Sequence, residues 1–183
     1  MRMLTMPTLA GLMLAACVTA VPQVPPPPPP PAPATNQPVP YTSADGRFSV
    51  TFPGGTVKQE TEPVALQGGG SSTLYEYWVE LEGGSVTYMV MYNDYAPDYA
   101  NDGATNVLAR TRDGAVKGKT LTSDVAIDLN GVPGRAFTCS DKDWNYSVHQ
   151  FLSGKRLYQL IVVWGNDHPA TATDEFMNSF RIM

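Results

Sequence analysis

The amino-acid sequence predicts an α+β domain, a mainly antiparallel sheet flanked by helices. Segments that alternate apolar and polar residues with a period of two recur through residues 41–183, and this alternation is typical of strands with one buried face. Glycine-containing turns join these segments in adjacent pairs, which favours antiparallel hairpins. Two segments with helical periodicity separate and follow the strand pairs. Residues 41–183 have the size of one domain with its own hydrophobic core.

The first strand signal is RFSVTFP, in which Phe48, Val50 and Phe52 share one side and Pro53-Gly54-Gly55 ends the strand. A hairpin follows, formed by TLYEYWVEL and SVTYMVMYN around Gly83-Gly84, a dipeptide that favours a two-residue turn. The turn predicts an apolar face made of four cross-strand pairs: Leu81 with Val86, Val79 with Tyr88, Tyr77 with Val90, and Tyr75 with Tyr92. The opposite face is expected to be partly buried. Its cross-strand pairs are Glu80 with Thr87, Trp78 with Met89, and Glu76 with Met91.

A helix is expected over residues 102–117. Ala104, Val107, Leu108, Thr111 and Ala115 share its apolar face, and the residues expected to turn away are Arg110, Arg112, Asp113 and Lys117.

Four strands and a final helix are expected after it. KTLTSDVAIDL and GRAFTCS are joined by a turn at residues 130–134, and YSVHQFLS and RLYQLIVVW by a turn centred on Gly154-Lys155. The segment RLYQLIVVW is apolar on both faces, so we place it in the middle of a covered sheet. The final helix is expected to open at Asp167-His168-Pro169. Core positions expected around this helix are Trp164, Phe176, Met177 and Phe180.

The N-terminal segment is typical of an exported lipoprotein. Residues 1–16 place one charge, Arg2, before a short apolar run, the layout of a secretory signal rather than of a membrane span. The small residues before Cys17 resemble a bacterial lipoprotein cleavage site, which implies that Cys17 carries the lipid and that the protein reaches the membrane through it. Because Val18, not aspartate, follows the cysteine, the resemblance implies, for a cell with two membranes, the outer membrane, facing the periplasm. The alternative is an ordinary signal peptide cut after Ala20, which leaves a soluble protein.

Residues 17–40 are interpreted as a tether. Prolines crowd this segment, seven of them in succession from Pro25 to Pro31, so an extended polyproline rod is expected. The rod serves as a spacer or, alternatively, docks on an aromatic groove of another protein.

Four segments resemble successive signatures of PsbP-like domains. They are DGRFSVTFPGG, DLNGVPGRAF, GKRLYQLIVV and FMNSFRI. The resemblance covers most of residues 45–182 and implies an α/β/α sandwich, as in a photosystem II extrinsic protein and many bacterial envelope lipoproteins. It also implies a binding or assembly role without enzymatic activity. These motifs contain no catalytic residue to carry over.

Motifs for catalysis and metal binding are weak. GAVKGKT has one residue too few for a phosphate loop and runs from helix to strand, so we interpret Gly118 as a helix end. Two acidic segments, residues 98–103 and 141–146, lack the glycine or ligands of a calcium loop. His149 is expected to be a satisfied structural histidine and Cys139 a buried small hydrophobe. No cofactor and no metal are expected.

The favoured function is a non-catalytic envelope lipoprotein that binds or helps to assemble another envelope component. The sequence has 12 basic and 17 acidic residues, which disfavours nucleic-acid binding. Trp78, Met89 and Met91 form the candidate partner patch, which is either roofed by the helix of residues 102–117, with Arg110 or Arg112 reaching the glutamates, or partly open. The alternatives are a hydrolase or other enzyme with an unrecognised site and a small-ligand-binding lipoprotein.

Overall fold

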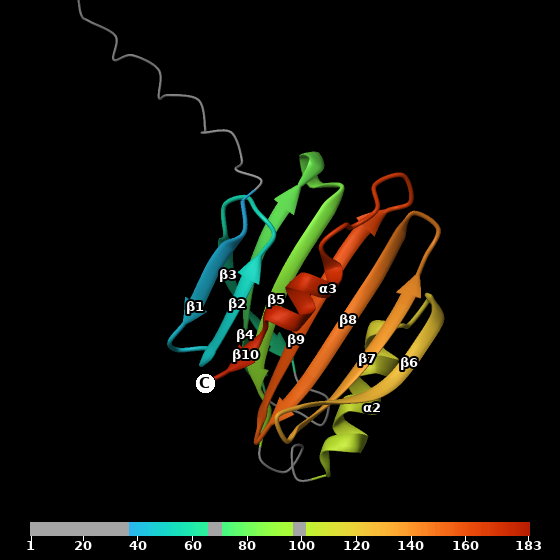
Figure 1. Ribbon diagram of the computed structural model, residues 1–183. Coiled ribbons are helices and arrows are strands. Elements are labelled where there is room, and N and C mark those ends of the chain that lie inside the picture. The colour runs from blue at the N-terminus through green and yellow to red at the C-terminus, as the bar shows by residue number, and fades with distance from the viewer. Residues whose placement is uncertain (1–36, 66–70, 97–101) are drawn as a thin grey trace, which may run out of the picture. The chain divides into compact units, whose positions relative to one another are not determined.

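The computed structural model describes residues 37–65, 71–96 and 102–183. Its central layer is a seven-stranded antiparallel sheet with strand order β3-β4-β5-β9-β8-β7-β6 (Figure 1). The strands are β3 (Lys58–Ala65), β4 (Ser71–Leu81), β5 (Val86–Asp94), β6 (Thr120–Leu129), β7 (Val132–Ser140), β8 (Trp144–Ser153) and β9 (Arg156–Gly165). The expected α+β class and the central place of β9 are confirmed.

The two helices lie on opposite faces of this sheet. The face toward the viewer in Figure 1, here the front face, is covered by α3 (Thr173–Ser179) and by a small sheet of strand order β1-β2-β10. The strands of the small sheet are β1 (Val39–Ser43), β2 (Phe48–Phe52) and β10 (Arg181–Ile182). The back face carries α2 (Ala104–Ala115), which packs against β7 and β8. The expected sandwich therefore has one helix on each side and an additional small sheet in front.

The β4–β5 hairpin has the expected register. All four predicted cross-strand pairs are present, from Leu81 opposite Val86 to Tyr75 opposite Tyr92. The connection differs from the expected two-residue turn, since residues 82–84 form a turn of 3-10 helix and Glu82 as well as Gly83 and Gly84 have positive φ. The alternation of side chains therefore predicted the pairing although the turn took another form.

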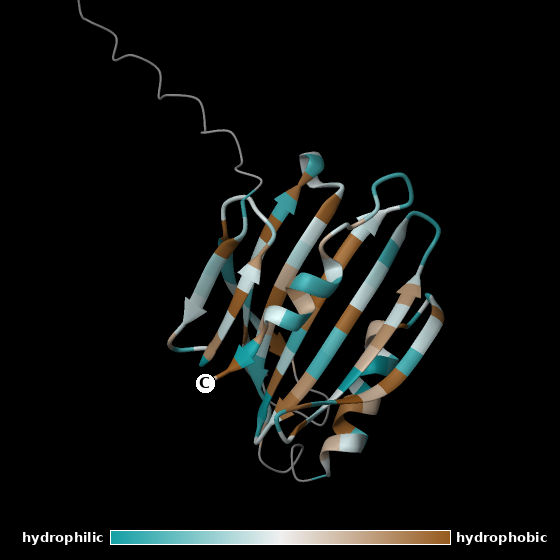
Figure 2. Ribbon diagram, viewed as in Figure 1, coloured by the Kyte–Doolittle hydropathy of each residue, from teal (hydrophilic) through white to brown (hydrophobic). Residues whose placement is uncertain are grey.

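The main core lies between the front face and its cover. Figure 2 shows the alternating apolar and polar bands along the strands that supply it. Phe48, Phe52 and Phe180 are at most 1% exposed. The rings of Phe48 and Phe180 meet tyrosines of β4, β5 and β9, and the Phe52 ring packs against Phe176 of α3. Trp164, expected in the core, is only partly buried at its margin.

A second core lies between α2 and the back face. Val107 and Leu108 of α2 pack with Leu152 and Leu157 at one end, and the other end of α2 covers Phe137, Cys139 and Val148 through two partly buried residues, Ala115 and Val116. The expectation that Arg112 faces solvent is wrong. Its guanidinium NH1 donates to Asp124 Oδ2 of β6 at 2.9 Å, and its side chain is only 19% exposed. This ion pair fixes α2 to the edge of the sheet.

Three strands and one helix boundary were not predicted correctly. β1 begins within the predicted tether, where Pro40 is tolerated because β1 is an edge strand. β3 is polar and contains Pro63, so it lacks the apolar alternation of a half-buried strand. α3 begins at Thr173 rather than at Pro169, because the His168 amide closes a turn on the Gly165 carbonyl before the chain returns to the sheet. The two-residue β10 is too short for any pattern.

No helix among the described residues is long and apolar enough to cross a membrane. The predicted signal segment, Cys17 and the tether up to residue 36 lie outside the described residues.

Candidate functional site

The predicted partner patch lies on the back face of β4 and β5. Trp78 is directly opposite Met89, and Met91 is opposite Glu76. All four side chains are half-buried. Trp78 Nε1 donates to Glu80 Oε1 at 3.0 Å, which holds the indole over the sheet surface. The patch is therefore a continuous surface of aromatic and thioether groups with carboxylates beside it.

The border of the patch is acidic. In the β3–β4 register, Glu60 lies opposite Glu76, and Glu62 occupies the same side of β3. Burial, followed by the charges of Glu62 and Glu60, raises the pKa of Glu76. Lys58 is the cation in this group, and it donates to Glu80 Oε2 at 2.7 Å. The carboxylates outnumber this single lysine, so the surface around Trp78 favours a positively charged counterpart.

Helix α2 does not supply the arginines that a roof over this patch requires. Arg110 bonds to Asp102, and Arg112 is paired with Asp113 and Asp124. The expected contact of Arg110 or Arg112 with Glu76 and Glu80 is therefore wrong. The physical reason is the position of α2, which packs against β7 and β8 rather than over β4 and β5.

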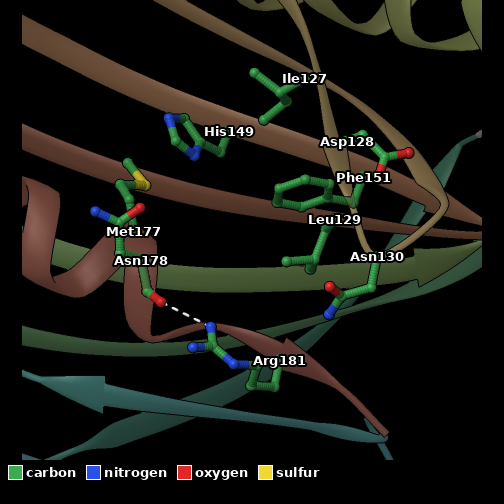
Figure 3. A pocket seen from close by; sticks show the side chains of 9 residues that line it. All are labelled: Ile127, Asp128, Leu129, Asn130, His149, Phe151, Met177, Asn178 and Arg181. Carbon is green, nitrogen blue, oxygen red and sulfur yellow. Dashed lines mark hydrogen bonds between the residues drawn. The ribbon is translucent and has the colours of Figure 1, made fainter.

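A pocket of about 420 Å³ lies on the front face, beside α3. Figure 3 shows the nine lining residues, which come from β6, the β6–β7 turn, β8, α3 and β10. They are Ile127, Asp128, Leu129, Asn130, His149, Phe151, Met177, Asn178 and Arg181. Sequence reasoning singled out only His149 and Met177 among them, and neither as part of a pocket. The other residues lie close together because β6 and β8 belong to one sheet and because α3 and β10 pack back onto that sheet. No short sequence motif indicates these contacts.

His149 is placed in this pocket without a hydrogen bond to any described residue. Its ring meets Phe151 edge-on, with centroids 6.3 Å apart. Burial lowers the pKa of His149, and the charge of Asp174 on α3 partly opposes that shift. The expectation of a satisfied structural histidine is therefore not met within the described part of the chain. At neutral pH the imidazole is therefore uncharged, and it has one donor nitrogen and one acceptor nitrogen.

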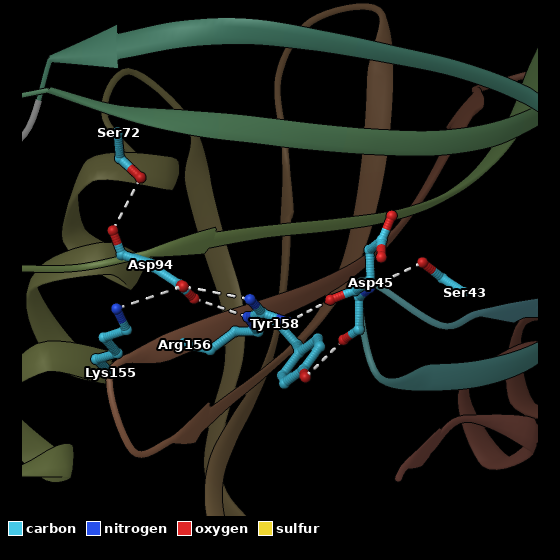
Figure 4. Close-up of polar contacts among 8 residues, drawn as sticks. Ser43, Asp45, Ser72, Asp94, Lys155, Arg156 and Tyr158 are labelled. Carbon is cyan, nitrogen blue, oxygen red and sulfur yellow. Dashed lines mark hydrogen bonds and ion pairs between the residues drawn. The ribbon is translucent and has the colours of Figure 1, made fainter.

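A second, smaller pocket of about 180 Å³ borders an ion-pair network at the start of β9 (Figure 4). Arg156 donates from Nε to Asp94 Oδ1 at 2.7 Å and from NH1 to the Asp45 carbonyl at 2.9 Å. Tyr158 Oη donates to the Gly46 carbonyl at 2.8 Å. The network ties the β1–β2 turn to the main sheet. Its charges are paired internally, so we assign it a structural role.

Three other residues that the sequence analysis considered, Asp141, Cys139 and Gly118, have structural roles. Asp141 Oδ1 accepts the backbone N–H groups of Asp143 and Trp144, so this carboxylate closes the β7–β8 turn. Cys139 is 4% exposed, and burial raises the pKa of its thiol, which confirms a buried small hydrophobe. Gly118 has a φ of 79° just after α2, as expected for a helix end. The acidic segment of residues 98–103 lies mostly outside the described residues.

The structure resembles cyanobacterial PsbP. The solution structure of that protein from Synechocystis sp. PCC 6803 aligns with a TM-score of 0.54, covering 81% of this chain and 94% of that chain with 15% sequence identity. No protein-family model matches this sequence, and no curated protein matches it. At this identity the likeness concerns the fold. The chain therefore has a PsbP-like fold, as the sequence motifs predicted.

Proposed function

We propose that this chain is a non-catalytic binding or assembly module, anchored in the bacterial cell envelope through a lipid on Cys17. The observation that carries the binding role is the half-buried Trp78–Met89 pair on the back face of the sheet. Both helices pack elsewhere, α2 on β7 and β8 and α3 on the front face. The PsbP-like fold supports the same role, because this fold is identified with binding rather than with turnover.

The proposed partner is an envelope protein that presents apolar side chains bordered by lysine or arginine. Tryptophan and methionine are enriched at interface centres, and a half-buried indole loses little conformational freedom when a partner covers it. Glu60, Glu62 and Glu76 make the border of the patch acidic. Opposite charges across such a border direct the encounter and strengthen it at low ionic strength.

The test compares two tryptophans in the same chain. Trp78→Ala removes the centre of the patch, whereas Trp144→Ala removes a side chain that is 38% exposed at the start of β8. Proteins crosslinked to wild type and to both variants in intact cells are identified by mass spectrometry, and thermal midpoints of the purified proteins are measured in parallel. We expect Trp78→Ala to keep its midpoint and to lose a partner that Trp144→Ala retains. Raised salt during crosslinking should reduce the amount of that partner captured by wild type. A midpoint several degrees lower in Trp78→Ala with the partner retained would contradict the proposal.

The anchor has its own test. Cys17→Ser is expected to abolish incorporation of labelled fatty acid and to move the protein from the membrane fraction to the soluble periplasm. A mature N-terminus at Val21 in unmodified, soluble wild type would show an ordinary signal peptide instead. The Trp78 experiment does not depend on this result, since crosslinking applies to a soluble periplasmic protein as well.

A further inference from the structure

We infer that the pocket beside α3 binds a small organic anion, an acid with an apolar body, independently of the partner patch on the back face. The pocket volume of about 420 Å³ lies within the range of roughly 300 to 1,000 Å³ typical of small-molecule sites. Its lining is about evenly divided, with four apolar residues, Ile127, Leu129, Phe151 and Met177, and five polar ones, Asp128, Asn130, His149, Asn178 and Arg181.

The pocket exists because the front cover is narrower than the sheet. A seven-residue helix such as α3 is only about 10 Å long. Seven strands at about 4.8 Å spacing span roughly 29 Å from edge to edge. The small sheet and α3 cover the middle strands, and the cover ends before β6. Figure 1 shows that α3 lies over the middle strands and does not extend over β6. The pocket between α3 and the β6–β7 hairpin follows from this difference in width.

The floor of the pocket is apolar and rigid. Phe151 and Met177 are 4% and 6% exposed, and the Phe151 ring stacks on Phe180 at 6.0 Å. Phe151 lies against Gly134 of β7, where a Cβ atom would come within 2.5 Å of the ring carbon Cδ1. Glycine at this position therefore lets the ring lie flat against β7, and Ile127 adds a further apolar wall. An apolar ligand body gains contact here without displacing a charged group.

The cation in the described lining of the pocket is Arg181. Arg181 NH1 donates to the carbonyls of Asn178 and Phe180 at 2.7 Å each, which fixes the guanidinium beside the opening. Its remaining N–H groups have no partner among the described residues, and within the same set it forms no ion pair. Figure 3 shows Arg181 and Asn130 on the same side of the Phe151 ring.

One carboxylate, Asp128, also lines the pocket, and one of its two oxygens is engaged in the β6–β7 turn. Asp128 Oδ1 accepts the Gly131 N–H at 2.7 Å within the β6–β7 turn. A planar guanidinium with free N–H groups beside an apolar floor matches a carboxylate on an apolar chain. None of the lining residues is a serine, threonine or cysteine, so the described pocket offers no hydroxyl or thiol nucleophile and its chemistry is that of binding.

The experiment uses the purified full chain and octanoate as the probe. Backbone amide shifts are followed by two-dimensional NMR as octanoate is added up to its solubility limit. We expect shifts confined to residues 127–130, 149–151 and 177–181, with octylammonium producing none. No saturable shift, or shifts centred on Trp78 and Met89, would overturn the proposal.

Charge variants test the role of the guanidinium. Arg181→Gln is expected to weaken octanoate binding at least tenfold, and Arg181→Glu to abolish it while admitting octylammonium. The matched controls are Lys142→Gln and Lys142→Glu, which make the same charge changes in the exposed β7–β8 turn and should bind octanoate as wild type does. Equal octanoate affinity in wild type and Arg181→Glu would overturn the proposal, provided that amide shifts outside the pocket show a folded variant.

Discussion

Arg156 lies directly opposite Asp94 in the β5–β9 register, and its Nε atom is 2.7 Å from the Asp94 Oδ1 atom. The same guanidinium stacks 4.6 Å above the Tyr92 ring and reaches the Asp45 carbonyl. One arginine therefore connects two strands of the main sheet with the β1–β2 turn of its front cover. The Arg156–Asp94 pair therefore links the seven-stranded sheet to the small sheet at the end of β5 and the start of β9.

Removal of the Asp94 charge should destabilise the fold in a pH-dependent way. Hydrogen bonds from Arg156 hold the pKa of Asp94 below its usual value, so the stabilisation is present above the unfolded-state pKa of about 3.9 and is lost as the pH falls through the folded-state pKa. Asp94→Asn is expected to lower the free energy of unfolding by about 1 to 2 kcal/mol near neutral pH, a modest loss because both side chains keep some exposure.

Urea unfolding of wild type and Asp94→Asn over a range of pH measures this difference. It should shrink below about pH 4, where the unfolded chain takes up a proton on Asp94 that the folded chain resists. Asp143→Asn, a change in the exposed β7–β8 turn, serves as the control and should follow wild type. A difference that stays constant down to about pH 2 would exclude the Asp94 charge as its cause.

Phe180→Ala should cost about 3 to 5 kcal/mol, the range for a fully buried aromatic residue. Phe180 is 1% exposed, and its ring centroid lies 5.7 Å from Phe48 and 5.6 Å from Tyr158. Trp164→Ala should cost less, because Trp164 is only partly buried. Pro25→Ala in the tether should leave stability unchanged. Equal thermal midpoints for Phe180→Ala and wild type would contradict the docking of the C-terminal segment on the sheet.

Gly134→Ala should destabilise the domain by about 1 to 3 kcal/mol or more. The new Cβ would lie 2.6 Å from the Gln150 carbonyl oxygen of the neighbouring strand, and backbone cannot rotate away as a side chain can. Gly114→Ala in α2 is the matched control, because its Cβ would meet no atom within 4 Å and alanine favours the helix by up to about 1 kcal/mol. Chemical unfolding should therefore give changes of opposite sign. A neutral Gly134→Ala would mean that Phe151 does not lie against β7.

The buried position of His149 should lower the free energy of unfolding of the domain as the pH falls below about 6.5. Burial lowers its pKa, so the unfolded chain takes up a proton near pH 6.5 that the folded chain resists, and stability decreases as the pH falls through about 6.5. His149→Gln removes this proton uptake. Urea midpoints at about pH 7.5 and 5.5 should therefore fall more for wild type than for His149→Gln.

The control for this experiment is the second histidine. His168 is half exposed and lies 3.0 Å from Glu82 Oε2 through Nδ1. His168→Gln should retain the loss of stability that His149 causes. If His149→Gln loses as much stability as wild type between the two pH values, the ring does not titrate from a buried position.

The alternation of apolar and polar residues along the chain was enough to predict the register of the β4–β5 hairpin and the central place of β9. Tyr77, Val79, Tyr88 and Val90 are buried in the predicted register, because one slip of the hairpin would turn every apolar side chain toward the other face. The central place of β9 followed from its apolar residues on both faces. Such features depend on near neighbours along the chain, so the alternation of apolar and polar residues was sufficient to predict them.

The sites required contacts between residues that are distant in the chain. Arg181 lines the same pocket as the β6–β7 turn because α3 and β10 lie on the front face of the sheet. No sequence pattern within a few residues of Arg181 predicts that position. The patch residues Trp78, Met89 and Met91 could be named from alternation, but their exposure depends on where α2 packs. An amphipathic helix can bury its apolar stripe on any sufficiently apolar part of a sheet. Its position over β7 and β8 was decided by the fit of Val107 and Leu108 against Leu152 and Leu157 and by the pairing of Arg112 with Asp124, interactions that exist only once the sheet has formed.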